Sequence, residues 1–286
     1  MPELPEVETV VRDLRPLLVG QTVVGVRVGT AQLRRPWNEA WAKVLSGATV
    51  VGISRRGKWI VVELTCSRDA KRSARDDRAP LRVAATHPRL LVHLGMTGQF
   101  TVNPAADAVP DHTHLVFDLA NGTQLRFRDT RRFGSVELFP DAAAVEAFLD
   151  ARLGPEPDAT DPAAFRTAVR GTARTLKAVL LDQTVVAGVG NIYADEALHR
   201  AGLHPERRGK SLTDAEIERL RGFVAAVIAH AIEYRGSTIR DYIGGSGLRG
   251  RFQDEFRAYG RDGEPCLTCG TTMALVRVSG RASHFC

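Results

Sequence analysis

Two hydrophobic periods divide this chain, and the first is helical. After Pro5, valines and leucines recur every three or four residues as far as Leu18, and Gly20 follows the run. This is the period of an amphipathic helix; Pro5 suits its first turn, and Gly20 suits its end. Pro2 and Glu3 therefore stand directly before a helix N-terminus, where the positive end of a helix dipole favours a carboxylate.

Short runs rich in Val, Ile, Leu and Phe come next, with the alternation typical of strands. They occupy residues 22–28, 49–54, 58–64, 89–102, 114–119 and 124–129. Asn121 and Gly122 predict a hairpin turn between the last two runs. Because no helical pattern alternates with these runs, we predict an antiparallel sandwich or barrel. The charged, weakly patterned stretch 67–80 is interpreted as a surface insertion.

The character of the chain changes around residues 153–162, where Pro and Asp replace strand-forming residues, and we place a domain boundary there. Helical periodicity then covers 162–171, 175–184, 191–202 and 213–234. The end of the chain returns to a hairpin pattern around cysteines. We therefore predict an α+β protein with an N-terminal β domain (1–150), a helical domain (151–257) and a metal-binding hairpin (258–286).

The charge balance favours a polyanionic partner. Thirty-nine Lys and Arg against 33 Asp and Glu give a net charge of +6 and a pI of about 9.4. Basic residues gather with glycines and aromatics at 54–58, 126–134 and 247–252, which suits loops that grip a phosphate backbone, although solvated surface charge is the alternative for each. No apolar run reaches the roughly 18 residues of a membrane span, and the acidic start lacks the features of a secretory signal. We expect a cytosolic protein that binds no membrane.

Three of the four cysteines lie close together: Cys266 and Cys269 form a CxxC pair, and Cys286 follows after sixteen residues. In a cytosolic chain this spacing on a glycine-turned hairpin predicts thiolate ligands for one structural Zn²⁺. A second CxxC pair would need a cysteine at position 289, so the fourth ligand stays open, with His284 as a candidate. A metal-free hairpin is the alternative. Cys66 is interpreted as an inert apolar residue.

Two further segments could carry chemistry. If Met1 is removed, the Pro2 nitrogen is a secondary amine with a pKa of about 8, able to attack a sugar carbon and form an iminium. Glu3 could then carry protons, although a plain helix start is the alternative. In residues 186–198, small residues precede a helix whose first amides, with Asn191, could bind a phosphate. A helical corner without a ligand would have the same pattern.

Six ordered segments carry a family resemblance that spans almost the whole chain. They are "MPELPEVE", "RRGKW", "HLGMTG", "RDTRRFG", "VAGVGNIYADEAL" and, after the CxxC pair, "RASHFC". Together they resemble the formamidopyrimidine-DNA glycosylase and endonuclease VIII family. The resemblance implies an N-terminal antiparallel β-sandwich, a helical domain with a helix-two-turn-helix, and a zinc-finger β-hairpin. It also implies a monomeric DNA glycosylase and AP lyase that acts on damaged double-stranded DNA.

The resemblance also implies roles for individual residues. Pro2 would be the Schiff-base nucleophile at C1′ of the damaged nucleotide, Glu3 the acid/base that assists ring opening, and Lys58 a contact to the phosphate beside the lesion. Successive β and δ eliminations would then cleave the strand. The matched DNA-binding residues are Met96, Arg131 and Phe133, which would fill the gap left by an extruded base, Asn191 and Arg281, which would hold the kinked phosphodiester, and His93, which could equally be a sheet histidine.

"PELPE", "MTG" and the glycine-rich stretch 237–252 favour the oxidised-purine branch, in which a loop of this kind closes over a flipped 8-oxoguanine. The residues matched to this lesion-capping loop are Ser237, Thr238, Gly244, Gly245, Gly247 and Arg249. An endonuclease VIII-like enzyme for oxidised pyrimidines is one alternative. A non-catalytic zinc-finger DNA-binding relative is another, and the joint presence of Pro2, Glu3 and Lys58 argues against it.

Overall fold

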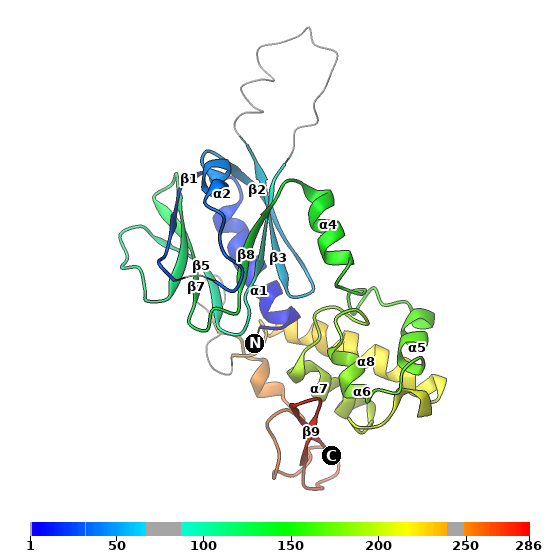
Figure 1. The fold of residues 1–286 in the computed structure, drawn as a ribbon. Coiled ribbons are helices and arrows are strands. Elements are labelled where there is room, and N and C mark those ends of the chain that lie inside the picture. Colours follow the sequence, from blue (N-terminus) through cyan, green and yellow to red (C-terminus); the bar gives the residue numbers. More distant parts are fainter. Residues whose placement is uncertain (1, 32, 67–86, 239–248) are drawn as a thin grey trace, which may run out of the picture. The chain divides into compact units, whose positions relative to one another are not determined.

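The computed structural model describes residues 2–31, 33–66, 87–238 and 249–286 (Figure 1). These residues form two units. The sandwich unit consists mainly of residues 6–149, and the helical unit of residues 150–238 and 250–286 together with Glu3–Pro5. The predicted α+β class is confirmed, since the first unit is built on antiparallel sheets and the second on helices.

The sandwich unit contains two four-stranded antiparallel sheets. One has the order β1-β6-β7-β5, with β1 Val23–Val28, β5 Gly98–Pro104, β6 Thr113–Leu119 and β7 Thr123–Asp129. The other has the order β2-β3-β4-β8, with β2 Thr49–Arg56, β3 Trp59–Thr65, β4 Arg89–His93 and β8 Ser135–Phe139. The predicted hairpin between β6 and β7 is confirmed: Gly122 has a φ of 81° there.

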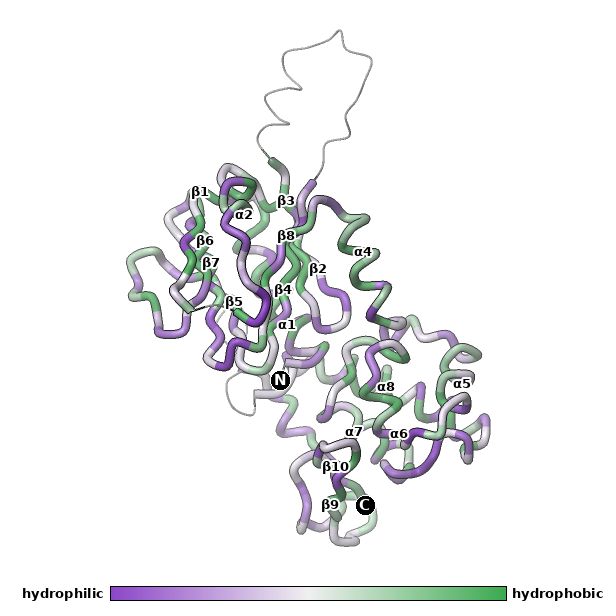
Figure 2. Tube along the Cα trace, in the orientation of Figure 1, coloured by the Kyte–Doolittle hydropathy of each residue, from purple (hydrophilic) through white to green (hydrophobic). Residues whose placement is uncertain are grey.

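Helix α1 (Leu4–Leu18) shares one apolar core with both sheets. Its residues Val7, Val11 and Leu14 are almost fully buried in the same cluster as Phe100 and Phe127 of the β1-β6-β7-β5 sheet. Figure 2 shows the hydrophobic stretches along strands and helices, with hydrophilic residues at many of the connecting loops. The helical period seen after Pro5 is therefore the buried face of α1.

Two expectations about the strands need correction. The run 89–102 is not one strand but two, β4 and β5, which belong to different sheets. A tight turn separates them: the Gly98 amide donates to the Leu94 carbonyl at 2.8 Å, and a Cβ at Gly98 would lie 2.2 Å from that oxygen. One helix, α2 (Ala40–Leu45), does interrupt the strand series, between β1 and β2, and α4 (Ala142–Asp150) follows the last strand of this unit. The strand pairings among the described residues are all antiparallel. The stretch 67–80 lies outside the described residues.

The helical unit contains all four helices that the periodicity predicts. They are α5 Pro162–Arg170, α6 Leu176–Leu181, α7 Asn191–Ala201 and α8 Asp214–Glu233, followed by the hairpin of β9 Ala274–Val278 and β10 Arg281–Phe285. Short 3₁₀ turns occur at Gly209–Ser211 and Phe252–Glu255. Thr213 and Glu216 form a capping box at the start of α8. None of the helices in the described ranges has the length and hydropathy to cross a membrane.

Candidate active site

Glu3 binds the N-terminus of α7. Its side chain is 2% exposed, and its Oε1 accepts a hydrogen bond from the Ile192 amide at 3.1 Å. A Cβ at Gly190 would lie 2.3 Å from the Glu3 Cδ, so only glycine leaves room for the carboxylate. A helix N-terminus thus stabilises Glu3 as expected, but the helix is α7 rather than α1. The amide that could have received a phosphate is occupied by this carboxylate.

Pro2 and Lys58 both belong to the sandwich unit. Pro2 is buried and lies two residues before the start of α1, whereas Met1 is outside the described residues. Lys58 is 6% exposed and follows Gly57, which takes a φ of 57° in the turn between β2 and β3. Glycine adopts this left-handed conformation at little cost, so Gly57 allows the tight turn that precedes Lys58.

His93 ends β4 and is held in its neutral form. Its Nδ1 accepts a hydrogen bond from the Gly95 amide at 3.0 Å, and its ring lies edge-on to Trp59 with centroids 4.6 Å apart. Burial, and then the positive charges of Lys58 and Arg35, lower the pKa of His93 to about 4. A neutral histidine with Nδ1 as acceptor carries its proton on Nε2.

The three residues matched to gap filling lie on two loops of the sandwich unit. Met96 is in the turn between β4 and β5, and Arg131 and Phe133 are in the loop between β7 and β8. Phe133 is 45% exposed, and the Arg131 guanidinium lies 4.8 Å from the centre of its ring. An exposed phenyl ring under a cation is a surface suited to stacking against bases.

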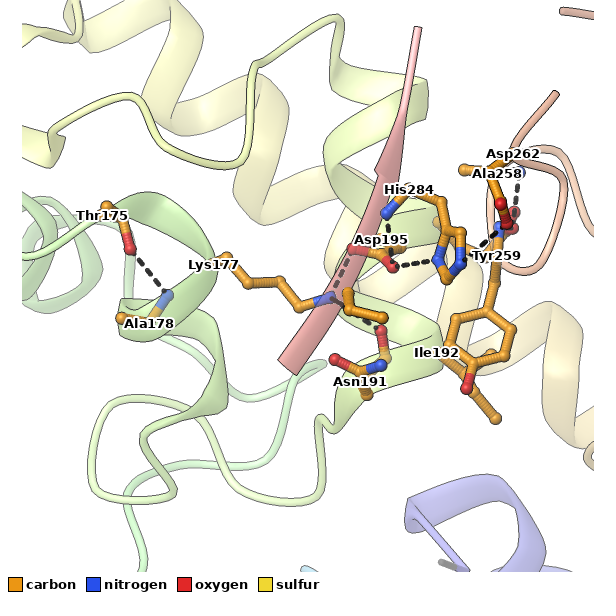
Figure 3. A network of polar contacts seen from close by, with 12 residues as sticks. Thr175, Lys177, Ala178, Asn191, Ile192, Asp195, Ala258, Tyr259, Asp262 and His284 are labelled. Carbon is orange, nitrogen blue, oxygen red and sulfur yellow. Dashed lines mark hydrogen bonds and ion pairs between the residues drawn. The ribbon is translucent and has the colours of Figure 1, made fainter. Parts of the chain in front are cut away.

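Asn191 is the first residue of α7, and a buried lysine supports it (Figure 3). The Lys177 Nζ donates to the Asn191 carbonyl at 3.1 Å and forms a fully buried ion pair with Asp195. Burial lowers the pKa of Lys177 below its usual value, although the Asp195 carboxylate opposes that shift. The Asn191 Oδ1 is itself buried without a hydrogen-bond partner among the described residues.

Asp195 extends this network to the strand that carries Arg281. One of its oxygens accepts from the His284 amide at 3.1 Å and from the His284 Nδ1 at 3.0 Å. The Lys177 Nζ also lies 3.5 Å from the Ala282 carbonyl, while the Arg281 side chain is exposed. The network therefore fixes the turn of Asn191 and the strand of Arg281 to each other (Figure 3). Neither Lys177 nor Asp195 was predicted from the sequence, although a lysine inside the apolar run "LKAVLL" is a signal for a buried charge.

Glu196, the next residue of α7, anchors the segment before the cysteines. Its fully buried carboxylate accepts from the backbone amides of Arg257, Ala258 and Tyr259 at 2.8 to 3.1 Å. It also pairs with Arg200 one turn further along the helix. Four donors satisfy the charge that burial would otherwise penalise.

The three sulfurs of Cys266, Cys269 and Cys286 lie within 4.8 Å of one another. A hydrogen bond with His199 lowers the pKa of Cys266 to about 7, and one with Thr271 lowers the pKa of Cys269 to about 7. A hydrogen bond with Cys269 instead raises the pKa of Cys286 to about 11, so its proton would leave only on metal binding. Three sulfurs this close together are the soft donors that Zn²⁺ prefers, so the donor set fits Zn²⁺.

His284 is not part of this sulfur cluster, contrary to its candidacy as the fourth ligand. Its Nδ1 is bonded to Asp195, and its Nε2 lies 3.5 Å from an Asp262 oxygen. Both ring nitrogens therefore face carboxylates. The short spacing to Cys286 could not reveal this: residues two apart share a face of a strand, but Cys286 lies beyond the end of β10.

Part of the predicted lesion-capping loop is described. Ser237 is 4% exposed, and Thr238 is held by Gln253, whose Oε1 accepts from its amide at 2.9 Å. The Thr238 hydroxyl in turn accepts from the Gly250 amide at 2.8 Å. Arg249 is exposed. Gly244, Gly245 and Gly247 lie outside the described residues.

Comparison with known protein families gives two matches. Residues 1–136 match the formamidopyrimidine-DNA glycosylase N-terminal domain, and residues 153–242 match the formamidopyrimidine-DNA glycosylase H2TH domain. Among curated sequences, the chain is 42% identical over 290 residues to the formamidopyrimidine-DNA glycosylase of Geobacillus kaustophilus, covering 100% of this chain and 98% of the relative. It is also 42% identical over 298 residues to that of Paracoccus denitrificans, covering 100% and 98%.

Solved structures agree. A complex between Lactococcus lactis Fpg and DNA containing an abasic site is 35% identical, with a TM-score of 0.84, covering 99% of this chain and 97% of that one. A structure of MutM in complex with DNA containing carbocyclic 8-oxo-G is 34% identical, with a TM-score of 0.85, covering 100% and 98%. The similarity thus extends over both units.

Proposed function

The chain belongs to the formamidopyrimidine-DNA glycosylase family, and on that premise we propose how its own residues perform the reaction. The protein is a DNA glycosylase of base excision repair that removes oxidised purines and, with the lyase activity of its family, cleaves the strand at the abasic site. Its partner is damaged double-stranded DNA, bound by a monomer. A cytoplasmic location, at the nucleoid in a bacterium, follows from that substrate.

Pro2 is the nucleophile in this proposal. Once Met1 is removed, its secondary amine attacks C1′ of the damaged nucleotide, the glycosidic bond breaks, and the base leaves with a proton. The nitrogen is then part of an iminium to the opened sugar. Loss of the C2′ proton expels the 3′ phosphate, and a second elimination expels the 5′ phosphate. A pKa of about 8 leaves a useful fraction of the amine unprotonated near neutral pH.

The fixed position of Glu3 is the observation that carries this assignment. A carboxylate that is 2% exposed and bonded to the Ile192 amide cannot swing freely into solvent. It is adjacent in sequence to the amine and can deliver a proton to the sugar ring oxygen as the ring opens. A plain helix start would have no need of a buried acid or of the glycine at position 190 that makes room for it.

Lys58, Asn191 and Arg281 bind phosphates in this proposal, and Met96, Arg131 and Phe133 replace the extruded base. The first group is supported by side chains that can donate hydrogen bonds to phosphate: Lys58 in a turn, Asn191 at the start of α7, and Arg281 at an exposed position of β10. The support for the second group is the exposed phenyl ring with its stacked guanidinium. Ser237, Thr238 and Arg249 take part in covering the flipped purine in this proposal.

Borohydride trapping tests the nucleophile. The matched proteins are a chain carrying a cleavable extension before Pro2, in which the nitrogen is an amide, and the same chain after the extension is removed by protease. We expect a covalent complex with a duplex containing 8-oxoguanine opposite cytosine only after removal, with the cross-link mapped to Pro2. Trapping by the extended chain would refute the assignment. A preference for 5-hydroxycytosine opposite guanine would indicate an endonuclease VIII-like enzyme instead.

We further propose that Cys266, Cys269 and Cys286 hold one structural Zn²⁺ in a zinc finger spanning residues 258–286. The other two domains of this proposal are a β-sandwich (1–150) and a helix-two-turn-helix domain (151–257). The metal would fix the hairpin that carries Arg281. Metal analysis should return one zinc per chain for the wild type and for Cys66→Ser, and much less for Cys269→Ser. Equal zinc in all three proteins would rule this site out.

A further inference from the structure

The carboxylate of Asp129 joins the two loops that carry Met96, Arg131 and Phe133. Asp129 ends β7 and is 0% exposed. Its Oδ1 accepts from the Thr97 hydroxyl at 2.5 Å, and Thr97 directly follows Met96. This bond links the β4–β5 turn with the β7–β8 loop, 32 residues apart in the chain.

The same carboxylate also holds both ends of the β7–β8 loop. Oδ1 accepts from the Arg131 amide at 3.2 Å, and Oδ2 accepts from the Gly134 amide at 2.8 Å. The Thr97 hydroxyl accepts from the Arg131 amide as well, at 3.2 Å. The segment that presents Arg131 and Phe133 is therefore closed around a single buried carboxylate.

The two loops also touch through their backbones. A Cβ at Gly95 would lie 2.5 Å from the Gly134 nitrogen and 2.6 Å from the Phe133 carbonyl carbon. A Cβ at Gly134 would lie 2.7 Å from the His93 carbonyl oxygen. Arg132, at the tip, takes the left-handed conformation with a φ of 57°, which is costly for a residue with a side chain. Such an arrangement persists only where the surrounding contacts determine it.

We propose that Asp129 and Thr97 are positioning residues that make the two loops one rigid element, so that Met96, Arg131 and Phe133 enter the duplex together. The inference rests on the proposed roles of those three side chains. These three side chains, here called the wedge, replace the stacking of the extruded base. DNA binding is tighter if their loops are ordered beforehand, because less conformational entropy is then lost on insertion. Neither Asp129 nor Thr97 touches DNA in this scheme.

Thr97→Val tests the coupling with minimal change in shape. Valine keeps the volume but removes the hydroxyl, so the Asp129 carboxylate loses a donor and the Arg131 amide loses an acceptor. Thr97→Ser keeps the hydroxyl and is the control. In the free full-length protein we expect faster amide hydrogen exchange over residues 130–134 in Thr97→Val than in either wild type or Thr97→Ser. Unchanged exchange in that loop would overturn the inference, whatever the enzyme does with DNA.

The second readout compares two substrates in single turnover. Excision of 8-oxoguanine opposite cytosine requires base extrusion, whereas cleavage at a preformed abasic site has no base to extrude. Losing a hydrogen bond to a charged group should slow excision in Thr97→Val by about tenfold, with abasic cleavage and the Thr97→Ser rates changed by less than about threefold. Equal losses on both substrates would indicate general damage and overturn the inference.

A double variant separates positioning from local stability. If Thr97 acts by positioning Phe133, Thr97→Val should lower the rate of 8-oxoguanine excision only slightly in a protein that already carries Phe133→Ala. The losses of rate from the two substitutions should then not add. Fully additive losses would contradict the inference. Failure of the proposed function is distinguishable, because a wild-type enzyme that is not trapped through Pro2 fails before any loop variant is compared.

Discussion

Acidification should destabilise the sandwich unit through His93. Its pKa of about 4 in the folded protein lies below the unfolded value of 6.5. Between these two pH values His93 is protonated in the unfolded state and neutral in the folded state. The stabilisation is complete above pH 6.5 and is lost as the pH falls towards 4. The full difference corresponds to about 3 kcal/mol, of which about 2 kcal/mol is lost at pH 5.

His93→Asn is the matched variant. The asparagine Oδ1 can replace the histidine Nδ1 as acceptor for the Gly95 amide, but asparagine does not titrate. Urea unfolding at pH 7.5 and pH 5 can be followed by tryptophan fluorescence, because all three tryptophans, at positions 37, 41 and 59, lie in the sandwich unit. Carboxylates elsewhere in the protein also titrate over this range. The quantity to compare is therefore the difference in free energy of unfolding between the wild type and His93→Asn at each pH.

We expect His93→Asn to be less stable at pH 7.5, where it loses the packing of the ring on Trp59, and the gap to the wild type to narrow by about 2 kcal/mol at pH 5. A gap that stays constant between the two pH values would refute the conclusion that His93 is held neutral. A gap that widens would mean that His93 gains a partner on protonation.

Three further changes have definite expected outcomes. Asp195→Asn leaves the ammonium of Lys177 buried without its carboxylate, so the helical unit should lose about 3–5 kcal/mol, measured by urea unfolding with circular dichroism at 222 nm. Gly190→Ala should displace Glu3, since the new Cβ would lie 2.3 Å from its Cδ, and lower the rate of lesion excision while DNA affinity persists. Arg281→Ala should weaken binding to all duplexes and lower the salt slope by about one charge, in titrations at several salt concentrations.

Periodicity predicted most helices and strands because burial of one face is written locally along the chain. The exceptions are informative. The run 89–102 is apolar on both sides of its turn, so its pattern does not show that Leu94 to Gly98 reverses the chain between two sheets. Helix α4 (Ala142–Asp150) is short and alanine-rich, with only Val145 and Leu149 buried, which leaves little period to detect.

The sequence could supply candidate site residues where a motif carries its own chemistry, as at Pro2, Glu3 and the cysteines. What the sequence could not give is the partner of each group. Glu3 reaches an amide 189 positions away, and Asp129 joins a hydroxyl in another loop. No local pattern encodes such long-range pairs, since any buried acid needs donors but its sequence neighbours do not say which.

The three amides bound by Glu196 suggest an order of assembly. They belong to residues 257–259, ahead of the first cysteine of the cluster, and their bonds involve no metal. Once α7 has folded, residues 257–259 are therefore attached to it. This attachment limits the volume that the three cysteine sulfurs can explore. Zinc would then bind to a segment that is already attached to α7. Removal of zinc by a chelator should therefore disorder residues 266–286, while residues 257–259 stay bound to Glu196.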